Sequence, residues 1–248
     1  MQLKKNGEKV ARCSTGDSIS ASDANWKFSG GVVKKFRNHI QKSVPFYGEG
    51  QDLVCRLSDF FVKPDSVCYD IGCSLGDLLL KLTKHNTHKP QIKWYGIDCE
   101  PEMIQEAQKK FGKNENVILE TADINTYEFQ KSDLIVSYYC IQFIHPKFRQ
   151  QLISRIYDSL EWGGAFIWFE KVRAPDARFQ DMMTSLYTDF KLAQGYSADE
   201  IIGKSKSLKG ILDPFSTFGN MEFLKRAGFV DVTTIMKYVC FEGYLAIK

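Results

Sequence analysis

Apolar residues recur along this chain in two patterns, short continuous runs and runs at helical spacing, and the two patterns alternate. Continuous apolar runs predict buried strands, whereas apolar residues three and four positions apart predict amphipathic helices, such as the one over 147–160. Strands that alternate with helices indicate an α/β fold with a mostly parallel sheet. The five strands expected in this part are 67–69, 92–97, 117–119, 133–137 and 165–170.

The segments before the first strand are of two kinds. Residues 1–25 are polar, which predicts a flexible N-terminal arm. Residues 26–62 carry two helical patterns, which stop at Pro45 and just before Pro64 because proline cannot continue a helix. We expect these two helices to cover a ligand pocket and to belong to a single domain that spans 26–248.

The later part of the chain departs from the simple alternation. Residues 172–218 carry helical patterning where a short crossover would be expected. An insert of this length usually forms a lid or an assembly surface, so we expect a helical lid that also forms a homodimer contact. A helix at 221–227 and two strands, 230–236 and 239–247, complete the chain. The prediction is a mostly parallel seven-stranded sheet with a C-terminal antiparallel hairpin.

A glycine-containing loop follows the first strand and precedes a helix. Gly72 and Gly76 permit a sharp turn and let a ligand approach the backbone, and the helix start offers free amides. Dinucleotide-binding loops carry three glycines, at positions that are Gly72, Ser74 and Asp77 here, so two are missing. The carboxylate of Asp70 would repel a pyrophosphate but attract a cation. The loop therefore favours a positively charged nucleoside such as S-adenosylmethionine (SAM), which carries an ammonium and a sulfonium.

Acidic and aromatic residues follow the next strands. Asp98 ends the second strand, where a carboxylate can accept hydrogen bonds from both hydroxyls of a ribose. Asp123 follows the third strand and is placed to accept from an adenine amino group, while Ile124 packs on the ring. Tyr138 and Tyr139 follow the fourth strand. We expect them to face the reacting group, because ligands of such sheets bind at the carboxyl ends of the strands.

Composition narrows the class of protein. The net charge of +3 is too small to indicate nucleic-acid binding. The seven cysteines are widely spaced and include no Cys-x-x-Cys pair, which is typical of reduced thiols in a cytosol. His85 and His88 lack acidic or cysteine neighbours, so we expect no metal site. With no signal-peptide core and no run of about 18 apolar residues, we expect a cytoplasmic protein that does not enter a membrane.

The ordered motifs resemble those of the class I SAM-dependent methyltransferases. They are Asp70-Ile71-Gly72-Cys73-Ser74-x-Gly76, Gly96-Ile97-Asp98, Asp123-Ile124 and Leu160-x-x-Gly163-Gly164. Further segments resemble the bacterial carboxy-SAM synthases that serve tRNA wobble-uridine modification, namely Gln41-Lys42-Ser43-Val44-Pro45-x-Tyr47, Ile141-Gln142-Phe143, Glu170-Lys171 and Gly195-Tyr196-Ser197. The resemblance implies a Rossmann-like fold and SAM as cofactor. It implies cofactor contacts at Tyr47, Asp70, Gly72, Cys73, Ser74, Gly76, Asp98, Cys99, Asp123, Ile124 and Tyr138.

Two positions depart from the synthase pattern. Tyr138 stands where the synthases have asparagine, and Ser205 stands where they have the arginine that pairs with the extra carboxylate of carboxy-SAM. Serine cannot replace the charged, two-pronged guanidinium. Lys204 and Lys206 flank Ser205, but neighbours on a helix point tens of degrees away from it. We therefore expect a methyltransferase that uses SAM itself and passes the methyl group in line to a small-molecule acceptor.

Such an acceptor can need a base, and the candidates are Tyr138, Tyr139, His145, Glu170 and Tyr196. Each has a structural alternative: the tyrosines can pack, His145 can start a helix, and Glu170 can pair with Lys171 or Arg173. Two other functions stay open: a carboxy-SAM synthase that uses SAM and prephenate in tRNA modification, and a non-catalytic SAM-binding protein whose tyrosines plug the acceptor site. An RNA-modifying enzyme would need a continuous basic surface, which the modest charge argues against.

Overall fold

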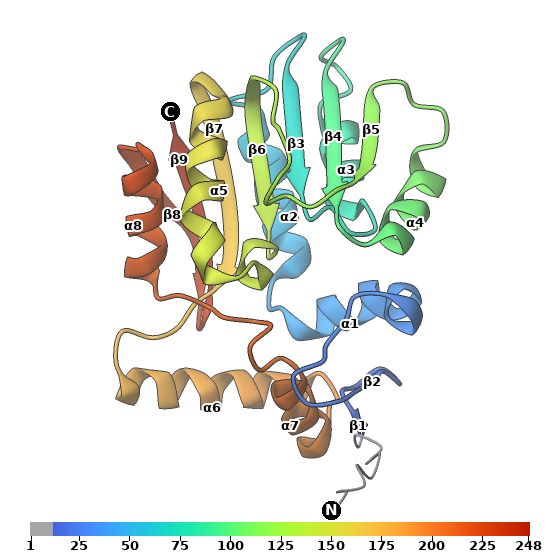
Figure 1. The fold of residues 1–248 in the computed structure, drawn as a ribbon, viewed down its shortest axis with the longest axis vertical. Helices are drawn as coiled ribbons and strands as arrows, with labels where there is room; N and C mark the ends of the chain where they lie inside the picture. Colours follow the sequence, from blue (N-terminus) through green and yellow to red (C-terminus); the bar gives the residue numbers. More distant parts are fainter. Residues whose placement is uncertain (1–11) are drawn as a thin grey trace, which may run out of the picture.

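A seven-stranded sheet forms the centre of the molecule in the computed structural model, which describes residues 12–248 (Figure 1). The strand order is β5-β4-β3-β6-β7-β9-β8, and β9 alone runs against the other six strands. This confirms the predicted mostly parallel sheet with an antiparallel end. The strands are β3 Val67–Ile71, β4 Lys93–Asp98, β5 Val117–Thr121, β6 Ser132–Tyr138, β7 Leu160–Lys171, β8 Asp231–Tyr238 and β9 Phe241–Ile247.

Helices cover both faces of the sheet, so its strands are apolar on both sides, as parallel strands usually are. Along β6, Leu134 and Val136 pack with α2 and α3, whereas Ile135 packs with α5 and α8 on the opposite face. The helices are α1 Phe36–Ser43, α2 Tyr47–Ser58, α3 Asp77–His85, α4 Pro101–Phe111, α5 Pro146–Ser159, α6 Ala177–Ala193, α7 Ala198–Ser207 and α8 Thr217–Ala227, with 3-10 helices η1 Gly30–Lys35 and η2 Ile141–Phe143.

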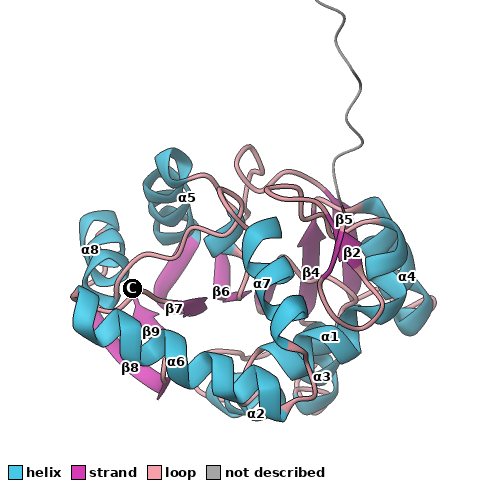
Figure 2. Cartoon of the chain, turned by 90° about the horizontal axis from the view of Figure 1, so that it is seen from below, coloured by secondary structure: helices cyan, strands magenta, loops and turns pink. Residues whose placement is uncertain are grey.

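The lid predicted over 172–218 consists of α6 and α7, which lie across the carboxyl ends of the strands (Figure 2). Its second helix begins with a capping box, in which the Ser197 side chain accepts from the Glu200 amide and the Glu200 carboxylate accepts from the Ser197 amide. Helix α1 lies at the same end of the sheet (Figure 1). The carboxyl ends of the strands are therefore enclosed by α1, α6 and α7.

The N-terminal segment differs from its prediction as a flexible arm. Residues 1–11 lie outside the described residues, but 12–25 include a small sheet of β1 Cys13–Ser14 and β2 Ser20–Ala21 that packs against α7. Ile19 enters an apolar cluster with Trp26, and Gly203 of α7 has no room for a Cβ because the Ser14 carbonyl lies against it. The polar composition misled the prediction, since a few buried apolar residues such as Ile19, together with the contacts to α7, hold this segment.

The two helices predicted before the sheet also have different bounds. The first is a 3-10 turn followed by α1, and the second begins at Tyr47 rather than at Leu53. Phe46 adopts a left-handed conformation with φ +55°, which lets the chain restart a helix directly after Pro45. This early start places Tyr47 beside the sheet.

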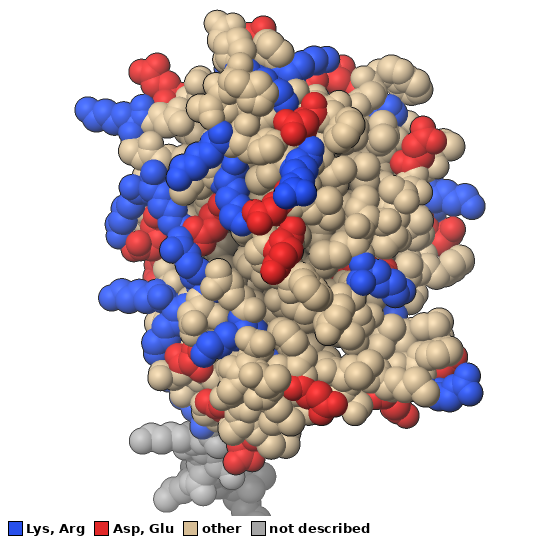
Figure 3. Space-filling view, turned by 180° about the vertical axis from the view of Figure 1, so that it is seen from behind, with Lys and Arg blue, Asp and Glu red and all other residues tan. Residues whose placement is uncertain are grey.

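None of the helices between residues 12 and 248 combines the length and apolar character that a membrane crossing requires. No group of three or more His, Cys, Asp or Glu side chains is arranged to hold a metal in this same part of the chain. On the face shown in Figure 3, Lys and Arg side chains stand among Asp and Glu side chains rather than forming a continuous basic surface.

Candidate functional site

The loop after β3 forms a cradle at the carboxyl ends of β3 and β4. Gly72 has φ +71°, and a Cβ there would collide with the Cys140 side chain, so only glycine fits. The amides of Gly72 and Cys73 both donate to the Ile97 carbonyl, at 2.7 and 3.0 Å. Gly76, with φ +70°, then starts α3. The loop is thus fixed on the neighbouring strand with its backbone open to a ligand.

Asp98 holds the other side of this cradle. Its Oδ2 accepts from the Ser74 amide at 2.9 Å, and its Oδ1 accepts from the Glu100 amide at 2.9 Å. Burial raises the pKa of this carboxyl, although those two amides oppose the rise. Each carboxylate oxygen has two lone pairs, so each can still accept from a ribose hydroxyl.

Asp70 is buried at the floor of the cradle and only 2% exposed. Its Oδ2 has no hydrogen-bond partner among residues 12–248. Burial, followed by the charge of Asp98, raises the pKa of Asp70 to about 7. A buried carboxylate without a partner is costly, and a cation placed beside it removes that cost. This orphaned oxygen and the tight glycine turn fit SAM, whose ammonium supplies such a cation.

The remaining predicted cofactor contacts lie around this cradle. The Tyr47 ring stacks on the Tyr139 ring with centroids 6.3 Å apart, and burial followed by the Asp70 charge raises the Tyr47 pKa. Asp123 lies just beyond β5, where its Oδ1 accepts from the Asn125 amide at 2.9 Å. Asp123 is exposed, whereas Ile124 is buried. Cys99, which follows Asp98, is exposed. The contacts of these residues with a cofactor stay predictions.

Tyr138 fills the space between β6 and α2. Its hydroxyl donates to the Tyr47 carbonyl at 2.7 Å, and Gly50 faces it with no room for a Cβ. Burial raises the pKa of Tyr138. These contacts give Tyr138 a packing role. The neighbouring Tyr139 has φ +60°, and its hydroxyl is buried with no hydrogen-bond partner among the described residues.

The other candidate bases lie apart from one another. His145 is exposed and its Nδ1 accepts from the Lys147 amide at the start of α5, as the helix-start alternative expected. Glu170 is buried, and burial raises its pKa to about 8. Tyr196 donates its hydroxyl to Asp17 of the N-terminal segment.

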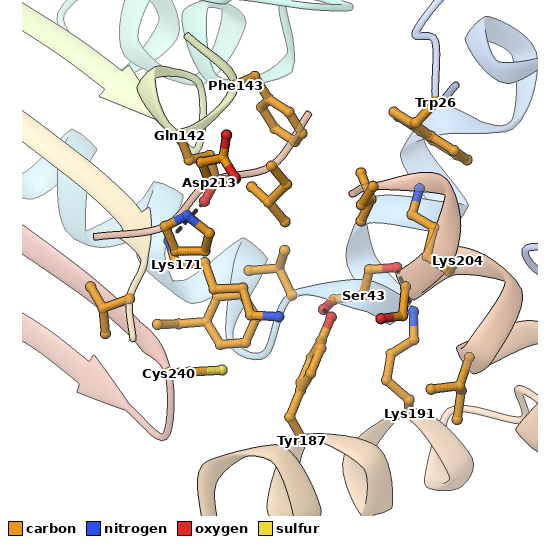
Figure 4. Close-up of a pocket in the computed structure, with 18 of the residues that line it drawn as sticks. Trp26, Ser43, Gln142, Phe143, Lys171, Tyr187, Lys191, Lys204, Asp213 and Cys240 are labelled. Carbon is orange, nitrogen blue, oxygen red and sulfur yellow. Dashed lines mark hydrogen bonds between the residues drawn. The ribbon is translucent and has the colours of Figure 1, made fainter. Parts of the chain in front are cut away.

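A cavity of about 560 Å³ lies between α1, the lid and the ends of β7 and β9 (Figure 4). None of the five candidate bases is among the described residues that line it. The cavity borders the cradle, because Gln142 and Phe143 line it while Cys140, just before them, contacts Gly72. It therefore occupies the place where an acceptor for a cradle-bound cofactor would lie.

Three lysines line this cavity, the buried Lys191 from α6 and the half-buried Lys171 from β7 and Lys204 from α7 (Figure 4). The Lys191 Nζ lies 3.1 Å from the Ser43 hydroxyl, and the Lys171 Nζ lies 4.2 Å from the Tyr187 ring centroid. Within residues 12–248, none of the three forms an ion pair with a carboxylate. Among the described residues that line the cavity, Asp213 alone is acidic. Basic side chains therefore outnumber acidic ones among the described residues that line the cavity.

Burial lowers the pKa of each of these lysines, to about 8 for Lys191, because an ammonium without a partner is poorly solvated there. The structure corrects the expectation that Lys204 points away from the site of Ser205, since both line the cavity. Lys206 is exposed and does not line it. Enough of α7 faces the cavity for two consecutive residues, Lys204 and Ser205, to line it.

Two of these lysines and one histidine are not among the residues predicted for the site. The sequence indicates Lys171 only as a partner of Glu170, and Lys191 lies in an amphipathic pattern where an outward direction is the usual expectation. His39, which also lines the cavity, lies in the first predicted helix. The sequence nevertheless contains a signal for their burial, because Lys191 and His39 have apolar neighbours on their helices.

Comparison with known proteins shows the family to which the chain is similar. A family model described as a methyltransferase domain matches residues 68–164. A carboxy-S-adenosyl-L-methionine synthase of Staphylococcus epidermidis is 35% identical over 224 residues, which cover 90% of this chain and 97% of that protein. The enzyme of the same name from Sulfurimonas denitrificans is 33% identical, over 90% of this chain and 94% of that protein.

Solved structures show the same fold. The SAM-dependent methyltransferase SibL in its apo form has a TM-score of 0.61 at 15% identity, over 89% of this chain and 60% of that one. Human N-acetylserotonin methyltransferase in complex with SAM has a TM-score of 0.54 at 17% identity, over 90% of this chain and 60% of that one. The Rossmann-like methyltransferase fold predicted from the motifs is therefore confirmed.

Proposed function

Because the chain belongs to the carboxy-S-adenosyl-L-methionine synthase family of class I methyltransferases, which use SAM, we propose that it transfers the SAM methyl group to a small acceptor bearing an anionic group. The observation that carries this proposal is the set of three cavity lysines without carboxylate partners beside the cofactor cradle, of which Lys191 is buried and Lys171 and Lys204 are half-buried. Buried cations are stable only when paired, so an anion is the ligand that such a cavity selects.

The chain's own residues position the two reactants. SAM, when bound, supplies an electrophilic methyl group on a sulfonium. Asp70 pairs with its ammonium and Asp98 accepts from its ribose hydroxyls, which fixes the cofactor against the Gly72 turn. The lysines orient the acceptor, and the lid helices exclude water from the cavity. Holding the reacting atoms in line accounts for most of the catalysis that such a displacement needs.

Ser205 supports methyl transfer over carboxy-SAM synthesis. It lines the cavity at the position that the resemblance assigns to an arginine in the synthases. A serine supplies neither the charge nor the paired donors of a guanidinium. Arg173 is the one arginine among the described residues of the cavity lining; it is exposed, and its Nε donates to the Pro214 carbonyl at 3.1 Å.

Carboxy-SAM synthesis is the second candidate function. The identity of 35% with a synthase over nearly the whole of both proteins favours it. Lys204 is the described cation nearest in sequence to Ser205 that also lines the cavity, and its ammonium could neutralise a carboxylate in place of the arginine. A carboxylated nucleoside formed from SAM and prephenate would establish this candidate.

The experiment for methyl transfer compares two sets of acceptors. Purified protein is incubated with SAM and either small hydroxy- and amino-carboxylic acids or their neutral amides, and S-adenosylhomocysteine is measured. We expect product with the acids only, and a KM for the acid raised by about tenfold or more in Lys191→Met, equal to about 1.4 kcal/mol. Lys206→Met is the matched control, because Lys206 is exposed and does not line the cavity. Equal rates with acids and amides would contradict the proposal.

A further inference from the structure

His39 of α1 lies in the cavity wall with its two ring nitrogens in different surroundings. The residue is 3% exposed, and its ring stacks on Trp26 with centroids 5.5 Å apart. Its Nδ1 lies 2.9 Å from Oδ2 of Asp17, whereas its Nε2 is buried and has no hydrogen-bond partner among residues 12–248. One nitrogen is therefore held by a carboxylate, and the other has no partner among the described residues, although the residue itself lines the cavity.

Asp17 is a buried acceptor with several donors around it. Its Oδ1 accepts from the Asn38 amide at 2.8 Å and from the Lys42 Nζ at 3.2 Å, and its Oδ2 accepts from the Tyr196 hydroxyl. Burial alone would raise the pKa of Asp17, but the hydrogen bonds from Tyr196, His39 and Lys42 lower it below its ordinary value. Asp17 is thus an ionised carboxylate at neutral pH.

The ionised carboxylate decides the tautomer of His39. A carboxylate can only accept, so the proton of the neutral ring lies on Nδ1 and points at Asp17. The Tyr196 hydroxyl, 3.2 Å from the same Nδ1, already donates to Asp17 and does not compete for that proton. Nε2 then carries a free lone pair. A ring nitrogen oriented by a second group in this way is the arrangement of a general base.

We propose that His39 accepts the proton of the methyl acceptor through Nε2, and that Asp17 positions the ring for this step. The inference rests on the proposed methyl transfer. The O–H or N–H proton of the acceptor passes to Nε2, and a lone pair of that acceptor oxygen or nitrogen forms a bond to the methyl carbon of SAM. The bond between this carbon and sulfur breaks at the same time, and its electron pair remains on sulfur. The imidazolium that forms is stabilised by Asp17 through the Nδ1 proton.

Charges around His39 couple this base to the anionic group of the acceptor. Burial, followed by the charge of Lys204, lowers the pKa of His39 to about 4, and Lys191 adds to this while Asp17 opposes it. Lys42 and Tyr196 are the other titratable groups that face this pair through Asp17. An anion bound among the lysines offsets their charge and raises the basicity of Nε2. His39 therefore becomes an effective base only when the acceptor is in place.

The state of the ring is tested by nitrogen NMR on protein with ¹⁵N-labelled histidine. The chain has four histidines, and His39→Gln identifies the signal of His39. We expect a neutral ring with its proton on Nδ1 at pH 7, and a shift of the proton toward Nε2 in Asp17→Asn. Asp59→Asn is the control, because it removes the partner of His85 and leaves His39 untouched. A proton on Nε2 in the wild type would overturn the inference.

Turnover tests the role itself, in the assay with hydroxy-carboxylic acids. We expect His39→Gln to retain SAM affinity and the KM for the acid but to lose kcat by about a hundredfold or more, as for other general bases. The wild-type kcat/KM should fall below pH about 4, where the free His39 becomes protonated, and above about 8, where Lys191 loses its proton. An unchanged kcat in His39→Gln overturns this inference alone, whereas a wild type that transfers no methyl group removes the proposed function as well.

Discussion

Oδ2 of Asp98 accepts a hydrogen bond from the backbone amide of Ser74 at 2.9 Å, which joins the end of β4 to the turn after β3. The two residues are 24 positions apart in the chain. The contact places a carboxylate at the rim of a glycine turn, and the orphaned Asp70 oxygen lies buried close to it. The proposed cofactor site depends on this pair.

Replacement of Asp98 by alanine is expected to weaken SAM binding by about a hundredfold. The variant loses the two hydrogen bonds proposed between the ribose hydroxyls and the Asp98 carboxylate, each worth about 1.5–3 kcal/mol, and water replaces part of this energy. Calorimetric titration of SAM measures the effect. Asp181→Ala, on the exposed face of α6, is the control and should bind as the wild type does. Equal affinities for the two variants would contradict the assignment.

Gly72→Ala should destabilise the protein and abolish SAM binding, because the new Cβ meets Cys140 and the left-handed backbone is strained by any side chain. A loss of about 2 kcal/mol or more in the free energy of unfolding is expected from such a clash. Gly31→Ala provides the comparison, since Gly31 has open space around it. Urea unfolding of the two variants checks the difference, and similar losses would be inconsistent with a tight turn.

SAM affinity should rise with pH, because the ammonium binds the ionised form of Asp70. The pKa of Asp70 is raised from 3.8 to about 7. In the protein without SAM, the protonated carboxyl therefore contributes a stability that is fully present below pH 3.8 and is lost as the pH rises through about 7. Between pH 5.5 and 7 the affinity should increase by up to about tenfold per pH unit. Asp70→Asn should flatten this dependence. A wild-type affinity that is constant over the range would refute the pairing.

Tyr138→Phe tests the packing role of that residue. The variant loses the hydrogen bond to the Tyr47 carbonyl and should lower the free energy of unfolding by about 1 kcal/mol. The rate of S-adenosylhomocysteine formation should change little, because Tyr138 does not line the cavity. A rate loss of about a hundredfold would instead indicate that Tyr138 acts as a general base.

That the residues of the proposed cofactor cradle lie together could be predicted from the sequence, because they lie at or directly after the ends of strands. Asp70 and Asp98 end adjacent parallel strands, and such ends meet at one edge of a sheet. The direction of a side chain at such an end could not be predicted. Tyr138, which turns to α2 rather than to the cavity, shows this limit.

The cavity could not be predicted because its walls come from distant segments. Lys191 and Lys204 reach it only through the packing of the lid, and the role proposed for His39 depends on Asp17 of the N-terminal segment, which folds back on it. Asp17 lies in a stretch whose composition indicated a flexible arm. Composition describes the residues of a segment, whereas its order here depends on the partner to which it binds.

The most direct test of the account is the mass of the nucleoside that the protein carries. Purified protein is incubated with SAM, prephenate and the small hydroxy-carboxylic acids, freed of unbound ligand, and denatured, and the released nucleoside is identified by mass spectrometry. We predict SAM and S-adenosylhomocysteine, together with a methylated acid in solution. Release of carboxy-SAM, or of no adenosine-containing compound, would contradict the account.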